Sequence, residues 1–166
     1  MSQVVKIFLR VFNVFLILFL TGCAAQRYHE RVETAPASGG ARPVFGWPMD
    51  GSKLLARYGA LEDGVTLKGI ILRGSEGQDV KAASGGEVVY VDDSLRGYGK
   101  TVVVEHPQGY SSVYARNAQI VVQVGEKVRK GQTLARAGRF GKSAEPQLYF
   151  EVRQNAKPVD PELVLK

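Results

Sequence analysis

The chain has 166 residues, enough for one domain of ordinary size, and its content of 45% hydrophobic and 23% charged residues is typical of a folded globular protein. The net charge of +6 suits a polyanionic surface, but it is too small and too dispersed for a nucleic-acid-binding stripe, so we expect no nucleic-acid partner. The single cysteine excludes an internal disulfide and a cysteine-rich zinc site.

Residues 1–22 have the layout of a secretory signal peptide. Two basic residues precede an apolar run over 11–20, which is shorter than the roughly 20 residues that a membrane-spanning helix needs. The next segment, Leu20-Thr21-Gly22-Cys23, resembles the lipobox of bacterial lipoproteins. This resemblance implies cleavage before Cys23 and attachment of a diacylglycerol to its thiol. An uncleaved N-terminal anchor helix is the alternative.

The segment after the cysteine predicts the location of the protein and a linker. Ala24 follows Cys23 where an inner-membrane retention signal would have Asp, so we expect an exported lipoprotein in the outer membrane, facing the periplasm. Residues 23–42 are small and polar and predict a flexible tether, in which His29 is solvated. The predicted organisation is therefore a signal peptide (1–22), a lipidated cysteine with its tether (23–42) and one folded domain (43–166).

The folded domain is predicted to be all-β. From residue 43 onward, β-branched and aromatic runs of strand length alternate with glycines, and no window of a dozen residues has a helical apolar period. The predicted strands cover residues 44–47, 69–72, 86–91, 101–105, 110–115, 119–124, 133–137 and 148–153. Such a series indicates a compact antiparallel β-sheet or sandwich.

Two glycine-containing segments predict turns. Gly125 and Gly131 are spaced for tight turns around a short strand within 124–134, a pattern found in LytM-type peptidases and in lipoyl or biotinyl carrier domains. A carrier would also need a lysine presented at a tight turn, and no such signature is present. Gly97-Tyr98-Gly99 predicts a sharp bend that leaves Tyr98 exposed.

From Trp47 to the C-terminus the sequence resembles the LytM or lysostaphin-type zinc endopeptidases of peptidoglycan. The matching landmarks, in chain order, are Gly46-Trp47-Pro48, Lys68-Gly69-Ile70, residues 80–86, Arg96-Gly97-Tyr98-Gly99, Val104-Glu105-His106, Tyr114-Ala115, residues 124–134, residues 148–153 and Val159-Asp160-Pro161. The resemblance implies the compact antiparallel β-fold of that family, of the duplicated-hybrid-motif type.

The metal-binding motifs of that family are missing. Active members hold zinc with His-x-x-x-Asp and the last histidine of His-x-His, and they use two further histidines in catalysis. By resemblance, the corresponding positions are Leu67, Ile71, Arg116, Gln147 and Tyr149. A catalytic zinc needs three protein ligands and an open coordination position, but residues 43–166 contain one histidine, His106, and no cysteine. The sequence therefore predicts no metal, no cofactor and no enzymatic activity.

Among LytM-type domains without these ligands, the sequence is most similar to the murein hydrolase activators of the EnvC and NlpD kind. That resemblance implies a periplasmic N-acetylmuramoyl-L-alanine amidase as partner, whose regulatory helix binds in the former active-site groove and is drawn off the amidase active site. It also implies peptidoglycan as a further partner and a role in cell-wall remodelling or daughter-cell separation.

The residues predicted to form this partner-binding groove combine apolar, aromatic and cationic side chains, which suit an amphipathic helix. They are Leu67 and Ile71 on the floor, Tyr98, Tyr114 and Tyr149 on the walls, Lys68, Arg116 and Arg153 on the rim, and Gln147. The alternative for these residues is that they fill the core. For the whole protein, the alternative is a lipoprotein that binds peptidoglycan or an envelope complex without activating anything.

Overall fold

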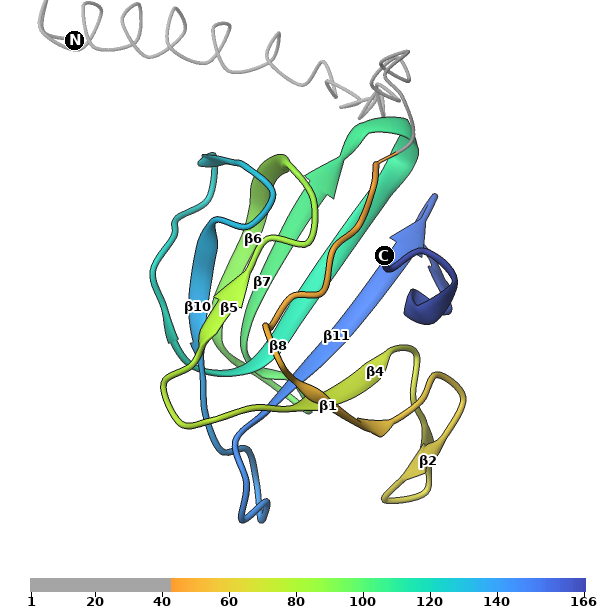
Figure 1. Ribbon diagram of the computed structural model, residues 1–166, viewed down its shortest axis with the longest axis vertical. Helices are drawn as coiled ribbons and strands as arrows, with labels where there is room; N and C mark the ends of the chain where they lie inside the picture. Colours follow the sequence, from red (N-terminus) through yellow and green to blue (C-terminus); the bar gives the residue numbers. More distant parts are fainter. Residues whose placement is uncertain (1–42) are drawn as a thin grey trace, which may run out of the picture. The chain divides into compact units, whose positions relative to one another are not determined.

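The computed structural model describes residues 43–166, which form an all-β fold with two short 3-10 helices (Figure 1). The predicted signal peptide, Cys23 and the tether lie outside these residues. The elements are β1 (Lys53–Ala56), β2 (Leu61–Glu62), β3 (Val65–Thr66), β4 (Ile70–Arg73), β5 (Asp79–Lys81), β6 (Gly86–Leu95), β7 (Gly99–His106), η1 (Pro107–Gly109), β8 (Tyr110–Ile120), β9 (Lys127–Val128), β10 (Thr133–Ala137), β11 (Gln147–Gln154), β12 (Lys157–Val159) and η2 (Pro161–Leu163).

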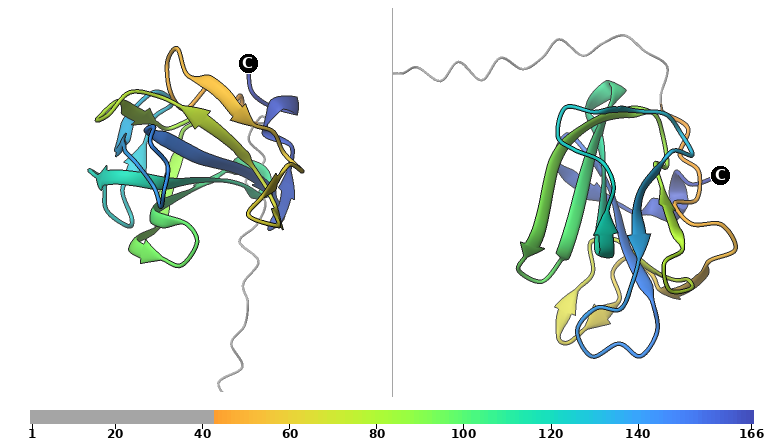
Figure 2. Two further views of the ribbon diagram at one scale, coloured as in Figure 1. Left: turned by 90° about the horizontal axis from the view of Figure 1, so that it is seen from below. Right: turned by 90° about the vertical axis from the view of Figure 1, so that its left-hand side faces the viewer.

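Ten strands form one sheet, and every pairing within it is antiparallel. Its main path runs β1-β4-β11-β8-β7-β6-β9, while β10 pairs with both β5 and the end of β8, and β12 pairs with β11. The strands β2 and β3 form a separate hairpin. Figure 2 shows that β5 and β10 stand apart from β6 and β7, with the interior between them. The predicted antiparallel β-fold is confirmed.

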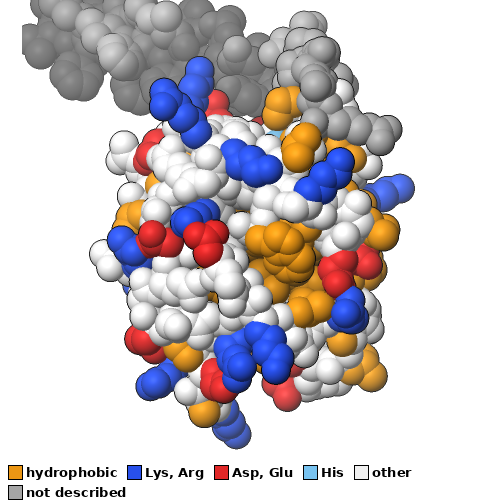
Figure 3. All heavy atoms as spheres, viewed as in Figure 1, with side chains coloured by type: hydrophobic (Ala, Val, Ile, Leu, Met, Phe, Trp, Pro, Cys, Tyr) orange, Lys and Arg blue, Asp and Glu red, His pale blue; other side chains and the backbone are white. Residues whose placement is uncertain are grey.

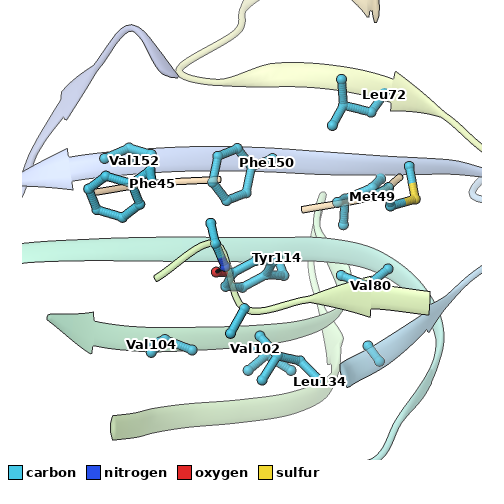
Figure 4. Packing of buried hydrophobic residues seen from close by; sticks show 14 of the residues in the cluster. Phe45, Met49, Leu72, Val80, Val102, Val104, Tyr114, Leu134, Phe150 and Val152 are labelled. Atoms are coloured by element: carbon cyan, nitrogen blue, oxygen red, sulfur yellow. Dashed lines mark hydrogen bonds between the residues drawn. The ribbon is translucent and has the colours of Figure 1, made fainter. Parts of the chain in front are cut away.

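The core lies between these layers because alternate residues of the long strands point inward. Phe150 on β11 and Tyr114 on β8 pack at 5.3 Å between ring centroids, and Phe45, Val80 and Leu134 close the cluster around them (Figure 4). Most of the predicted strands are present. Residues 44–47 form no strand and contribute a single bridge, from Phe45 to Leu165. The predicted strands 110–115 and 119–124 are one continuous strand, β8, which ends at Ile120. The strands β1, β5 and β12, of three or four residues, are too short for a periodic pattern and lack the β-branched run that marks the equally short β4.

Figure 3 shows charged side chains of both signs scattered over one face of the molecule, with an apolar patch between them. Within residues 43–166 no helix is long and apolar enough to cross a membrane. The β2–β3 hairpin and the connection from β10 to β11 both project from the end of the sheet that is lowest in Figure 1. These two projections border the candidate site.

Candidate functional site

A row of three side chains crosses the sheet beneath the site. Tyr149 on β11 is paired with Ile71 on β4 and with Ala115 on β8, so the three residues lie side by side on one face. Together with Leu67 they form a small buried cluster separate from the main core. Gly69 permits this arrangement, because a Cβ atom there would lie 2.3 Å from the carbonyl oxygen of Phe150. The close packing of β11 against this residue therefore explains the glycine in the Lys68-Gly69-Ile70 motif.

Above this row lies an open cavity of about 640 Å³, a size within the usual range for ligand sites. The hairpin forms one side and the β10–β11 connection forms the other. The lining residues are Glu62, Asp63, Val65, Thr66, Leu67, Lys68, Gly97, Tyr98, Arg116, Phe140, Gly141, Lys142, Ser143, Gln147 and Tyr149. The wall is thus mixed, with apolar, aromatic and charged groups facing one space.

Arg116 is the most constrained charged group of the cavity. It lies at a β-bulge of β8, where Ala115 and Arg116 stand opposite one residue of β7, and its φ of 68° is left-handed. The bulge turns its guanidinium into the cavity, where it lies 5.0 Å from the ring centroid of Phe140 and 5.3 Å from that of Tyr149. Both terminal nitrogens donate to the carboxylate of Glu62, at 2.9 and 2.5 Å.

A buried carboxylate supports the aromatic wall. Glu151 is fully buried on β11, and its Oε1 accepts hydrogen bonds from the hydroxyls of Tyr149 at 2.7 Å and Tyr98 at 3.1 Å. Its Oε2 accepts from Nε of Arg153 at 2.7 Å. The rings of Tyr98 and Tyr149 meet edge to face at 5.5 Å. One carboxylate therefore fixes two aromatic groups of the cavity wall and one arginine.

The pKa values of these groups follow from their contacts. Burial raises the pKa of Tyr149, and the hydrogen bond to the Glu151 carboxylate raises it further. Burial and the charge of Glu151 likewise raise the pKa of Tyr98. Burial lowers the pKa of Arg153, whereas the hydrogen bond to Glu151 and the charge of Glu151 raise it. The second effect is larger, so the pKa of Arg153 is raised overall. Both phenols therefore stay neutral and Arg153 stays charged.

Six of the nine predicted groove residues line the cavity: Leu67, Lys68, Tyr98, Arg116, Gln147 and Tyr149. Arg153 does not line it but is linked to its wall through Glu151. Tyr98 is half-buried against Tyr149 and less exposed than the two neighbouring glycines suggested.

Two of the predicted groove positions need correction. The prediction that Tyr114 forms a wall of the groove is wrong, because Tyr114 is fully buried in the main core, where its hydroxyl accepts from the Ala83 amide at 2.8 Å (Figure 4). Its neighbour Ala115 points to the opposite face, because successive residues of a strand alternate, and it lies in the buried cluster beneath the cavity. Ile71 lies beneath the floor, 4% exposed and covered by its cluster, and does not line the cavity.

Glu62, Phe140 and Glu151 belong to the site but are absent from the sequence-based prediction. A signal for Glu151 is present, because Tyr149, Glu151 and Arg153 alternate along one strand face and an acid is rare in an otherwise apolar strand. Phe140 and Glu62 reach the cavity from a loop and from a two-residue strand, neither of which has a periodic pattern.

The cavity does not fit a zinc ion. Its lining has no histidine or cysteine, and one of its two carboxylates is already held by Arg116. Leu67, Ile71 and Tyr149, the residues at the predicted metal-ligand positions, come together as an apolar cluster. No group of three histidine, cysteine, aspartate or glutamate side chains placed for a metal occurs in residues 43–166.

His106 lies at the end of β7 and is buried in the core instead of lining the cavity. Its Nδ1 donates to the Gly85 carbonyl at 2.8 Å, and its Nε2, 2.7 Å from the Ser112 hydroxyl, accepts from that group. Its ring meets Phe45 edge-on at 5.2 Å. Burial lowers the pKa of His106, so the neutral ring is the favoured form.

The fold and the cavity define a peptidase-like β-domain whose cavity is lined by no histidine or cysteine. The sequence matches Peptidase family M23 over residues 66–161. The chain belongs to this family.

Named relatives include activators and lipoproteins. The chain is 42% identical over 130 residues to "Lipoprotein NlpD/LppB homolog" of Pseudomonas aeruginosa, a match that covers 78% of this chain and 41% of the relative. It is 43% identical over 117 residues to "Murein hydrolase activator EnvC" of Escherichia coli, covering 70% of this chain and 27% of EnvC. The chain therefore corresponds to less than half of either relative.

Among solved structures, a zinc-containing peptidase from Vibrio cholerae superposes with a TM-score of 0.64 at 27% identity. The superposition covers 70% of this chain and 39% of the peptidase. The β-fold is therefore shared with a peptidase that contains zinc.

Proposed function

We propose that this protein is a non-catalytic, membrane-anchored activator of periplasmic N-acetylmuramoyl-L-alanine amidases in cell-wall remodelling or daughter-cell separation. It binds the amidase regulatory helix in the cavity and draws that helix off the amidase active site. The observation that carries the proposal is a cavity at the expected peptidase site that is lined by Leu67, Tyr149 and Arg116 and does not fit zinc. The names of the relatives, murein hydrolase activators, agree with this role.

The composition of the cavity supports a helix as ligand. Leu67, Tyr98 and Tyr149 offer an apolar and aromatic surface, and Lys68, Arg116 and Lys142 add positive charge around it. An amphipathic helix that lies in an apolar groove is a recurrent mode of recognition, and Tyr and Arg are common hot-spot residues at interfaces.

The membrane anchor is part of the proposal. Cys23 carries the lipid, which holds the protein in the outer membrane facing the periplasm, and a relative named as a lipoprotein agrees with this arrangement. Cys23→Ser should abolish labelling by a fatty-acid analogue and leave the protein unprocessed or soluble. Labelling that persists in the variant would show that the lipid is attached elsewhere.

The central test measures release of dye-labelled peptidoglycan by purified amidases from the same genome, with and without this protein. We expect stimulation by the protein, no peptidoglycan cleavage by the protein alone and no stoichiometric zinc in metal analysis. Lys68→Glu and Tyr149→Ala should weaken stimulation, and Tyr149→Ala should weaken amidase binding by about 2 kcal/mol. Lys127→Glu, an equal change of charge at an exposed residue of β9, is the control. If no amidase is stimulated, a passive envelope-binding role replaces this proposal.

A further inference from the structure

The pair formed by Arg116 and Glu62 joins two elements that are otherwise weakly connected. Arg116 is part of the large sheet, whereas Glu62 belongs to the β2–β3 hairpin, whose strands pair only with each other among the described residues. Leu61 and Val65 on the same hairpin are 73% and 67% exposed, so the tip packs little apolar surface against the domain. The tip is therefore held over the cavity mainly through this ion pair.

The guanidinium of Arg116 needs an anionic partner wherever the hairpin lies. Its side chain is only 7% exposed, and a buried charge left without a partner is strongly unfavourable. The rings of Phe140 and Tyr149 and the backbone bulge hold it in place, so it cannot turn out to solvent easily. The Glu62 side chain is 34% exposed and can return to water at lower cost.

The other charges around the cavity also favour an anionic partner for Arg116. Lys68, Arg116 and Lys142 line it together with the two acids Glu62 and Asp63. When Glu62 is withdrawn, three cations face one anion. A ligand then binds more favourably if the group that it places beside Arg116 is acidic.

We propose that Arg116 is a carboxylate-recognition point of the groove and that Glu62 is its displaceable internal occupant. The partner helix places an Asp or Glu side chain on the Arg116 guanidinium, and the β2–β3 hairpin swings away as Glu62 is released. This inference rests on the proposed function, because it takes the amidase helix as the occupant. To the proposed function it adds that the contact at Arg116 is an ion pair with a carboxylate and that the β2–β3 hairpin must move.

The test uses the full-length protein in mild detergent and the purified amidase that it stimulates. Glu62→Gln removes the negative charge of the internal occupant, so the amidase should bind at least about 3-fold more tightly. Asp79→Asn is the matched control, because it removes one charge from the ion pair with Arg136, away from the cavity, and should leave affinity unchanged. Amide hydrogen exchange over residues 58–67 should be faster in Glu62→Gln and unchanged in Asp79→Asn.

A double-mutant cycle assigns the effect to the ion pair. Arg116→Ala should weaken amidase binding, and Glu62→Gln should change nothing in that background. In the amidase, one acid-to-amide substitution in the regulatory helix should lose its effect when Arg116 is absent. Unchanged or weaker binding by Glu62→Gln, with wild type still stimulating the amidase, overturns this inference alone. A wild-type protein that stimulates no amidase overturns the proposed function and the inference together.

Discussion

The hydroxyl of Tyr149 donates a 2.7 Å hydrogen bond to Glu151, two residues further along the same face of β11. Tyr149 lines the cavity, whereas Glu151 is fully buried behind it. A change in the buried carboxylate or its partners is thus transmitted to the cavity wall through one bond. Under the proposed function, stability and amidase binding are therefore coupled at this point of the sheet.

Arg153→Ala should destabilise the fold. The substitution leaves Glu151 without its cation, and breaking a buried ion pair commonly costs 3–5 kcal/mol. Because the Arg153 side chain is 33% exposed, water can partly replace it, and we expect a loss of about 2 kcal/mol in the free energy of unfolding. Urea denaturation measures this loss. Arg129→Ala, at an exposed arginine, should change stability by less than about 0.5 kcal/mol. Equal effects of the two variants would contradict the role of the Glu151 pair.

Tyr149→Phe should separate the hydroxyl from the ring. The variant keeps the ring contacts with Tyr98 and Arg116 but loses the donor to Glu151 and the acceptor for the Lys68 amide. We expect a loss of about 1–2 kcal/mol in unfolding free energy and weaker amidase stimulation, because the ring is no longer fixed. Tyr98→Phe removes a longer bond, of 3.1 Å, to the same oxygen and should have the smaller effect on stability. The reverse order in urea denaturation would refute this ranking.

The sheet could be predicted because its long strands have a clear composition, whereas the strands of the β2–β3 hairpin have none. The strands β2 and β3 have two residues each, too few for a period. Asp63-Gly64 between them is the strongest local signal for a two-residue hairpin, and both residues have positive φ, 49° and 79°. Reading this dipeptide would have predicted the turn. It would not have predicted that Glu62 meets Arg116, which depends on the tertiary fold.

The groove face could be predicted only in part, because the bulge in β8 changes the alternation. Tyr110 and Tyr114 point to the main core, and the same period would direct Arg116 there too. The extra residue at Ala115–Arg116 shifts the register, and Arg116 faces the cavity. Sequence alternation alone thus cannot decide which of Tyr114 and Arg116 faces the groove.

Tyr114→Phe should reduce stability without affecting the groove. The Tyr114 hydroxyl accepts from the buried Ala83 amide and lies 2.9 Å from the Ser112 hydroxyl, and burial raises the pKa of Tyr114 to about 12. Removing it leaves a buried amide without its acceptor, which typically costs about 1–3 kcal/mol. Thermal unfolding should show this loss, while amidase stimulation well below the melting temperature should equal that of wild type. A folded Tyr114→Phe protein that fails to stimulate the amidase would contradict the claim that Tyr114 acts only on stability.

The stability of the domain should fall as the pH drops through the range in which unfolded histidine takes up a proton. Both ring nitrogens of His106 are used in their neutral form, with Nδ1 donating to Gly85 and Nε2 accepting from Ser112. Burial lowers the pKa of His106 below the ordinary value of 6.5. Between the lowered folded value and the unfolded value, the unfolded chain binds more protons, so acidification favours unfolding.

We therefore expect the free energy of unfolding, measured in urea between about pH 5 and pH 8, to decrease below about pH 6.5 and to level off below the pKa of folded His106. His106→Gln should be less stable at neutral pH, because Gln cannot make both hydrogen bonds in the same geometry, and its pH profile should be flatter over this range. His29→Gln is the matched control, because it removes the chain's other histidine, which belongs to the predicted tether outside the described residues, and it should keep the wild-type profile. A wild-type profile that stays level from pH 8 to 5, or a His106→Gln profile as steep as that of wild type, would show that His106 does not carry the pH dependence.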